Sequence, residues 1–148
     1  MKHFILLFIF CISNIYSQNT DYNTKKGFAA EGYDVVAYFS NEAKEGSKSF
    51  VSEFDGVRFK FSSKENLELF NKNPKKYIPQ YGGYCAYAVA LKGSKASINP
   101  EAFLIDDGKL YLFYDAWGTN TLELWKKENP AVLTEKANNN WNDIKSKK

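Results

Sequence analysis

The chain has 148 residues, 44% of them hydrophobic, and a formal net charge of +3, which fits one globular domain with a single core. This charge is too balanced for a protein that binds nucleic acid by electrostatic attraction. One His, one Met and two Cys also leave few of the side chains that commonly bind transition metals.

The N-terminus has the pattern of a secretory signal peptide. A basic start precedes an apolar run over residues 4–12, and a small residue, Ser17, stands at the expected cleavage position. The run is shorter than the roughly 18 residues of a membrane-spanning helix, so we expect no stable membrane span. We predict removal of residues 1–17 and export to the periplasm or out of the cell.

Export would limit the chemistry of the mature protein. Cleavage removes Met1, His3 and Cys11, so Cys85 would be the single remaining cysteine and the net charge would be +2. A Cys-His pair, a Ser-His-Asp triad and an intramolecular disulfide could then not form. The usual ligands of zinc, copper and haem would also be missing, so we expect no metal site and no evident cofactor. A lipid anchor at Cys11 is an alternative, but no small residues precede it.

The first elements are predicted from composition and from apolar periodicity. Residues 18–31 are polar and are expected to form a flexible segment before a single domain over residues 32–148. We find no linker or internal repeat that indicates a second domain. Residues 33–40 are β-branched and aromatic, which predicts a strand, and alternating apolar residues around Asp55-Gly56 predict a β-hairpin.

A helix is expected after this hairpin. Ser62 and Glu65 have the spacing of a capping box, and Pro74 ends the apolar pattern. Residues 75–83 are interpreted as a rigid connector. The helical spacing that follows predicts a short, mostly buried helix. Its apolar face would comprise Tyr84, Tyr87, Ala88 and Leu91.

The C-terminal third repeats this combination of hairpin and helix. Asp107-Gly108 lies between two apolar runs, which predicts a second β-hairpin. Two helices follow, and the second begins at Asn129-Pro130, a capping residue with proline at the first helical position. The sequence therefore predicts a small α+β domain with two β-hairpins and about four short helices.

Three stretches, "GYDVVAYFS", "FKFSSKENLELFNKNPKKYIPQYGGYCAYAVA" and "DGKLYLFYD", resemble the exported YHS-domain proteins over roughly residues 32–126. The resemblance implies a fold rather than a particular activity. Related YHS and TRASH-type modules often bind metals through cysteines in an FCS..C pattern. Ser62 and Asn66 stand at the corresponding positions here, so the chain departs from that metal-binding pattern.

Cys85 is the first candidate for chemistry. Gly82 and Gly83 precede it, and backbone N–H groups at such a helix start could activate the thiol or hold an anion. However, free cysteine is commonly a buried packing residue, and the tyrosine-rich surroundings favour this interpretation. Asp34 could accept N–H groups of the Gly82-Gly83 turn, as a structural residue, or could act as a ligand or general base beside Cys85.

We therefore predict a site between the Tyr33-Asp34 segment and the turn that leads to Cys85. Its candidate ligand-binding residues are Tyr33, Asp34, Tyr81, Gly82, Gly83, Cys85 and Tyr114. The main hypothesis is a binding or accessory module for a small molecule or an anion, without an evident catalytic activity. The alternatives are a thiol-dependent enzyme or redox protein that uses Cys85, and a metal carrier that uses Cys85 and carboxylates.

Overall fold

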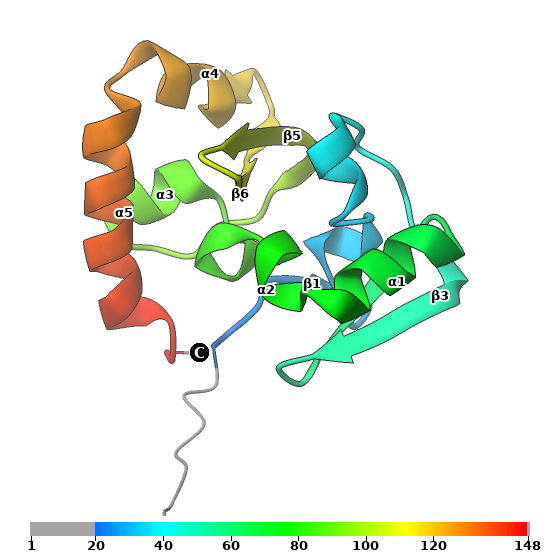
Figure 1. Cartoon of the computed structure of the whole chain (residues 1–148). Coiled ribbons are helices and arrows are strands. Elements are labelled where there is room, and N and C mark those ends of the chain that lie inside the picture. Colours follow the sequence, from blue (N-terminus) through cyan, green and yellow to red (C-terminus); the bar gives the residue numbers. More distant parts are fainter. Residues whose placement is uncertain (1–19, 148) are drawn as a thin grey trace, which may run out of the picture.

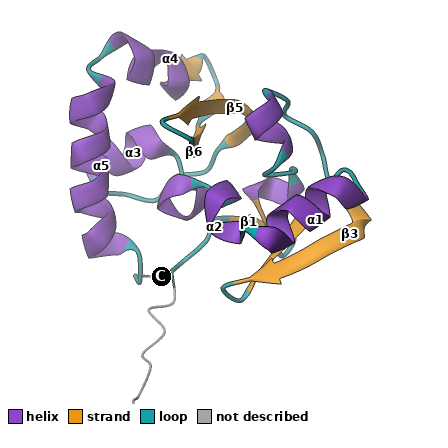
Figure 2. Cartoon of the chain, viewed as in Figure 1, coloured by secondary structure: helices purple, strands orange, loops and turns teal. Residues whose placement is uncertain are grey.

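The computed structural model describes residues 20–147, so the predicted signal peptide and Cys11 lie outside the described residues. Helices and strands in small sheets confirm the α+β class. Three helices gather on one side of the molecule, and the first hairpin with its helix lies on the other (Figures 1 and 2). The three are α3 (Ala86–Lys92), α4 (Thr121–Lys127) and α5 (Pro130–Ile144). The first hairpin is β3 (Ser47–Phe54) with β4 (Val57–Phe61), and its helix is α1 (Lys64–Lys72).

The segment that the sequence predicts to be flexible is instead part of the first sheet. β1 (Thr24–Lys25) and β2 (Phe28–Ala29) extend the hairpin into a sheet with the order β1-β2-β4-β3. Phe28 and the two alanines after it are buried, because this short apolar run packs against β4. The expectation of a loose N-terminal segment was therefore wrong for the described residues up to 31.

Residues 33–40 do not form the predicted strand. They include a 3₁₀ helix, η2 (Ala37–Ser40), which follows a first 3₁₀ turn, η1 (Ala30–Gly32). The Asp34 carboxylate accepts the backbone N–H groups of Val36, at 2.9 Å, and Ala37, at 3.2 Å. A short acidic side chain that bonds its own following backbone favours a turn over a strand, and composition alone does not show this competition.

Both predicted hairpins are present and have the same register. β5 (Asn99–Asp106) and β6 (Lys109–Phe113) form the second hairpin. In each hairpin, the Asp-Gly turn has positive φ at both residues, as a type I′ turn requires. The pairing is also irregular at matching places, between Ser47 and Val51 in β3 and between Asn99 and Phe103 in β5.

The helices after the two hairpins match as well, so the chain contains an internal repeat. "LELFNKNP" (67–74) corresponds to "LELWKKENP" (122–130), and in both places a second helix starts at the proline. Phe70 of α1 packs on Phe59 and Phe61, with ring centroids 4.9 Å apart in each pair. Trp125 of α4 packs in the same way on Tyr111 and Phe113, at 6.0 and 5.5 Å. We call residues 30–77 the first repeat and residues 81–144 the second repeat.

This repeat corrects the expectation that the chain contains none. Each repeat begins with three consecutive residues of positive φ: Ala30, Glu31 and Gly32 in the first, and Tyr81, Gly82 and Gly83 in the second. The two repeats still form one domain, because Leu110 and Leu112 of the second share a buried core with Val35 and Phe59 of the first. A hairpin of β7 (Asp115–Ala116) and β8 (Thr119–Asn120) follows β6 in the second repeat.

Three details of the helices differ from the sequence predictions. Ser63, one residue later than expected, caps α1 by accepting the N–H of Asn66. Residues 75–83 are no plain connector, because they contain most of α2 (Pro74–Tyr77) and η3 (Gln80–Gly83). Helix α3 buries a different face from the predicted one, with Leu91 exposed. The buried residues of α3 are Ala86, Val89 and Ala90.

The two ends of the described chain meet beside α5. The backbone N–H of Asp21 donates to the carbonyl of Lys145 at 2.8 Å, and Figure 1 shows these ends side by side. Among residues 20–147, no helix combines the length and the apolar character that crossing a membrane needs.

Candidate functional site

Asp34 lies at the centre of the first repeat and is fully buried. Besides the two N–H groups of its own turn, its carboxylate accepts the backbone N–H and the hydroxyl of Ser62, at 2.8 and 2.7 Å. It also accepts the side-chain amide of Asn66 at 2.7 Å. Asp34 therefore joins η2 to the start of α1. The predicted structural role is right in kind, but the segment it fixes is not the Gly82-Gly83 turn.

Cys85 is fully buried at the start of α3. Its sulfur accepts the backbone N–H of Tyr114 at 3.4 Å and lies 3.3 Å from the Thr121 hydroxyl oxygen. That hydroxyl donates its single hydrogen to the Tyr114 carbonyl at 2.8 Å, so the thiol must be the donor to Thr121. Through these two hydrogen bonds, the protonated thiol links α3 to the end of β6 and to the start of α4.

Cys85 occupies in the second repeat the position that Asp34 occupies in the first. Each side chain accepts the N–H of the first residue after a hairpin, which is Ser62 for Asp34 and Tyr114 for Cys85. Each also contacts a polar side chain of the following helix, which is Asn66 for Asp34 and Thr121 for Cys85. Their own N–H groups also have matching acceptors, the carbonyls of Lys44 and Ala96. This equivalence supports a structural role for Cys85, because Asp34 performs one with the same partners.

The Gly82-Gly83 turn does not present an open cradle for an anion. The Asp21 carbonyl fills the space above Gly82, where a Cβ atom would come within 2.3 Å of the oxygen. Asn23 holds the turn from the same side, with its N–H on the Gly82 carbonyl at 2.8 Å and its side-chain amide on the Gly83 carbonyl at 3.1 Å. The turn is therefore an anchor for the N-terminal segment.

The remaining tyrosines of the prediction lie in different places. Tyr81 is buried, its hydroxyl donates to Asn138 at 3.0 Å, and burial raises its pKa above the ordinary value. Tyr81 and Gly82 line a cavity of about 420 Å³ beside α5. Cys85 and Tyr114 line a separate, mainly apolar pocket of about 320 Å³. The predicted single site between Tyr33 and Cys85 therefore does not exist as one pocket.

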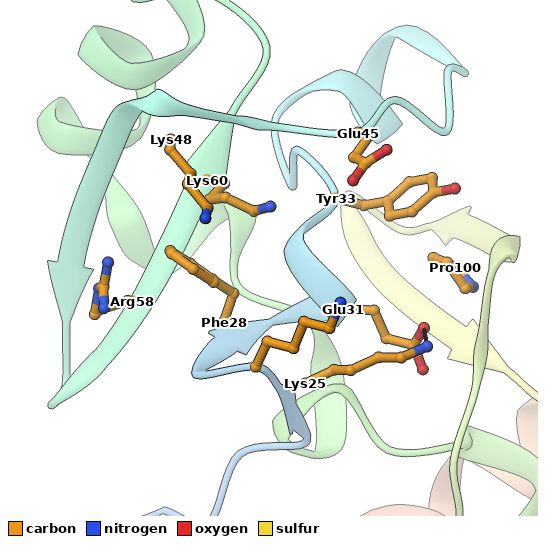
Figure 3. A pocket seen from close by; sticks show the side chains of 10 residues that line it. Lys25, Phe28, Glu31, Tyr33, Glu45, Lys48, Arg58, Lys60 and Pro100 are labelled. Carbon is orange, nitrogen blue, oxygen red and sulfur yellow. Dashed lines mark hydrogen bonds and ion pairs between the residues drawn. The ribbon is translucent and has the colours of Figure 1, made fainter.

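Tyr33 instead lines a pocket of about 760 Å³ on the first repeat (Figure 3). This basic pocket has basic residues from β1, its turn, β3 and β4: Lys25, Lys26, Lys48, Arg58 and Lys60. Phe28, Glu31, Tyr33, Glu45 and Pro100 complete its lining. Sequence reasoning missed these basic residues because they are spread over three separate segments.

Two of these cations are held against an aromatic ring. The Arg58 guanidinium lies 4.5 Å and the Lys60 ammonium 4.9 Å from the centre of the Phe28 ring. Lys25 pairs with Glu31 at 2.8 Å, but within residues 20–147 Lys26, Lys48, Arg58 and Lys60 have no carboxylate partner. The pocket therefore keeps an excess of positive charge.

The positions of Arg58 and Lys60 on the hairpin can also accept apolar residues. Leu110 and Leu112 occupy the same register positions in the second repeat, where they are fully buried in the core that the repeats share. The first repeat leaves this face of its sheet open and places cations on it. The alternation of Arg58 and Lys60 with apolar residues is the sequence signal that could have indicated this face.

The described residues contain no group of three or more His, Cys, Asp or Glu side chains that could hold a metal ion. Asp34, the most buried carboxylate, has its oxygens occupied by hydrogen-bond donors of the protein. The absence of a metal site in the mature protein stays a prediction from the sequence.

A comparison with models of protein families, with curated proteins and with solved structures finds no match to this chain. The resemblance to YHS-domain proteins consequently stays an expectation from the sequence.

Proposed function

We propose that this chain is an exported module of YHS type that binds a small acidic ligand in the basic pocket. One observation carries the proposal: four of the lining cations have no carboxylate partner among residues 20–147, in a pocket large enough for a small organic molecule. Unpaired cations that converge on one pocket are the donors that proteins use for carboxylates and phosphates.

The contacts around Phe28 support this proposal. A guanidinium that already lies over an aromatic ring loses less conformational freedom on binding than a free side chain, and its planar fork can bind two oxygens of one anion. Lys48 and Lys60 lie on the same side of the pocket as Arg58 (Figure 3). This side therefore offers several donors to one acidic group.

The two alternative functions have less support. A thiol enzyme would need Cys85 in contact with its substrate, whereas the buried thiol is used in hydrogen bonds to α4 and β6. A metal carrier would need a cluster of ligands, and none is found within the described residues. The apolar run over residues 4–12 supports the exported part of the proposal.

Binding of ethyl phosphate, a small dianion, tests the proposal directly. We expect an NMR titration of the mature protein to shift the backbone signals around Arg58 and Lys60. The double variant Arg58→Gln/Lys60→Gln should lose about 10-fold or more in affinity, since hydrogen bonds to charged groups are each worth about 1.5–3 kcal/mol. Native mass spectrometry of protein purified from the cell envelope would reveal a retained acidic molecule as added mass.

Lys64→Gln/Lys72→Gln on α1 is the matched control. It removes the same charge from exposed positions outside the pocket. Equal losses in the two double variants would mean a general charge effect, and no shift at all in the wild-type protein would overturn the proposal.

A further inference from the structure

The basic pocket has two chemically different sides. Lys48, Arg58 and Lys60 lie on the side of β3 and β4, and Tyr33, Glu45 and Pro100 lie opposite them (Figure 3). A pocket for a simple anion needs only the first side. The second side offers a carboxylate and an aromatic ring, two groups that attract an ammonium ion, beside the apolar edge of a proline.

Glu45 and Tyr33 are available for such a contact. No ion pair or side-chain hydrogen bond of Glu45 occurs within residues 20–147, and Glu45 is exposed. In this same part of the chain, the Tyr33 hydroxyl makes no hydrogen bond, and the residue is only half-buried. Glu31 differs, because Lys25 already neutralises it at 2.8 Å.

The backbone holds these two side chains together. Tyr33 and Glu45 face each other in an isolated antiparallel bridge. The turn before Tyr33 has positive φ at Ala30, Glu31 and Gly32, a conformation that non-glycine residues rarely adopt and that is concentrated at functional sites. The bridge therefore places a ring and a carboxylate beside each other at the wall opposite the cations.

We infer that the ligand is a zwitterion that carries an acidic group and an ammonium group a few bonds apart. Its phosphate or carboxylate binds Arg58, Lys48 and Lys60, and its ammonium group lies between Tyr33 and Glu45. This inference rests on the proposed function, since it assigns the ligand class of the same pocket.

Two probes that differ in one group test the inference. 2-Aminoethyl phosphate carries an ammonium group in place of one hydrogen of the methyl group of ethyl phosphate, and its net charge is therefore less negative. A uniformly basic pocket would bind ethyl phosphate more tightly, whereas the two-sided pocket should prefer 2-aminoethyl phosphate by about threefold, the strength of a partly exposed ion pair. The direction of the preference is thus opposite in the two cases.

Variants locate the ammonium site. Glu45→Gln should remove the preference for 2-aminoethyl phosphate without weakening the binding of ethyl phosphate. The control Glu65→Gln on α1 should leave both affinities unchanged. Tyr33→Phe should keep the preference because it keeps the ring, and Tyr33→Leu should lose part of it. A preference that survives Glu45→Gln in full would overturn the assignment of Glu45.

The outcomes separate the inference from the proposed function. Equal binding of the two probes, or tighter binding of ethyl phosphate, overturns the inference of a zwitterionic ligand but agrees with the proposal of an acidic ligand. Binding of neither probe overturns both. Vesicles of phosphatidylethanolamine distinguish a lipid headgroup from a free molecule as the ligand. Co-sedimentation of the protein with the vesicles would identify the ligand as a lipid headgroup, and binding of the soluble probe alone would identify it as a free molecule.

Discussion

Two residues in equivalent positions, Asp34 and Cys85, connect a helix start to the end of a hairpin in each repeat. Asp34 uses a charged carboxylate with donors from η2, Ser62 and Asn66. Cys85 uses a neutral thiol, which both donates and accepts. The same geometry thus tolerates two chemistries, provided that the surrounding donors and acceptors are matched to each of them.

Asp34→Ala should strongly destabilise the fold. The substitution leaves several buried donors without an acceptor, and we expect a loss of about 3 kcal/mol or more in the free energy of unfolding. Chemical denaturation followed by circular dichroism measures it. The exposed acid Asp143 on α5 provides the control, and Asp143→Ala should change stability by less than about 0.5 kcal/mol. A similar small change for Asp34→Ala would contradict the role assigned to its carboxylate.

Cys85 should react slowly with thiol reagents. Its side chain is fully buried, so labelling at neutral pH requires local opening, and we expect a rate at least about 100-fold below that of free cysteine. Cys85→Ala should cost about 1–2 kcal/mol of stability through the lost sulfur contacts. Rapid labelling of the native protein, with the circular dichroism spectrum unchanged, would instead place the thiol in an accessible site.

At the scale of the elements, each repeat starts with a turn of left-handed backbone, and this turn has a different role in each repeat. In the second repeat, Tyr81, Gly82 and Gly83 turn the chain so closely that the Asp21 carbonyl packs directly on Gly82. In the first repeat, the same turn carries Glu31 and leads into Tyr33, and these side chains reach the basic pocket. One turn type therefore serves as an anchor in one repeat and as a pocket wall in the other.

Gly82→Ala should be far more costly than the same change at Gly118. Both glycines have positive φ, 59° and 76°, so both substitutions carry the conformational penalty of about 1 kcal/mol. A methyl group at Gly82 would also meet the Asp21 carbonyl at 2.3 Å, whereas the space around Gly118 is open. We expect Gly82→Ala to lose about 3 kcal/mol in total and to release the N-terminal segment to proteolysis. Equal losses at the two sites would show that the close contact is unimportant.

At the scale of the whole molecule, the N-terminal segment connects the two repeats. The Tyr22 ring packs on Phe59 of the first repeat, with centroids 6.3 Å apart. Asp21 accepts the Tyr84 hydroxyl of the second repeat at 2.9 Å and pairs with Lys95 at 2.7 Å. Burial, together with the nearby carboxylates of Asp55 and Asp21, raises the pKa of both Tyr22 and Tyr84 to about 12.

These raised pKa values predict alkaline sensitivity. Both phenols ionise near pH 10 in the unfolded chain and only near pH 12 in the folded protein. Between these values the folded protein binds more protons, so the free energy of unfolding should fall as pH rises from 10 to 12. The double variant Tyr22→Phe/Tyr84→Phe should show a shallower fall in urea melts across this range. An identical slope in both proteins would rule out these tyrosines as its cause.

Local sequence patterns were sufficient for the hairpins and the terminal helices. The Asp-Gly turns need positive φ at two residues, and the alternation of apolar residues sets one buried face of each strand, so these elements follow from short-range rules. The burial of Cys85 agreed with its apolar neighbours. The predicted strand over residues 33–40 was wrong, because the Asp34 carboxylate bonds the backbone that follows it and is held there by Ser62, a residue distant in sequence.

The sequence by itself determined the α+β class, the two hairpins and the low numbers of His, Cys and Met. Only the tertiary structure decided which of the candidate residues share a pocket. Tyr33 lines the same pocket as Arg58 and Lys60 because β2 pairs with β4 in parallel, whereas Asp34 is buried and Cys85 contacts Thr121 at the start of α4. The physical reason is that a pocket is formed by side chains from distant segments, and their convergence depends on long-range strand pairing and core packing rather than on local periodicity.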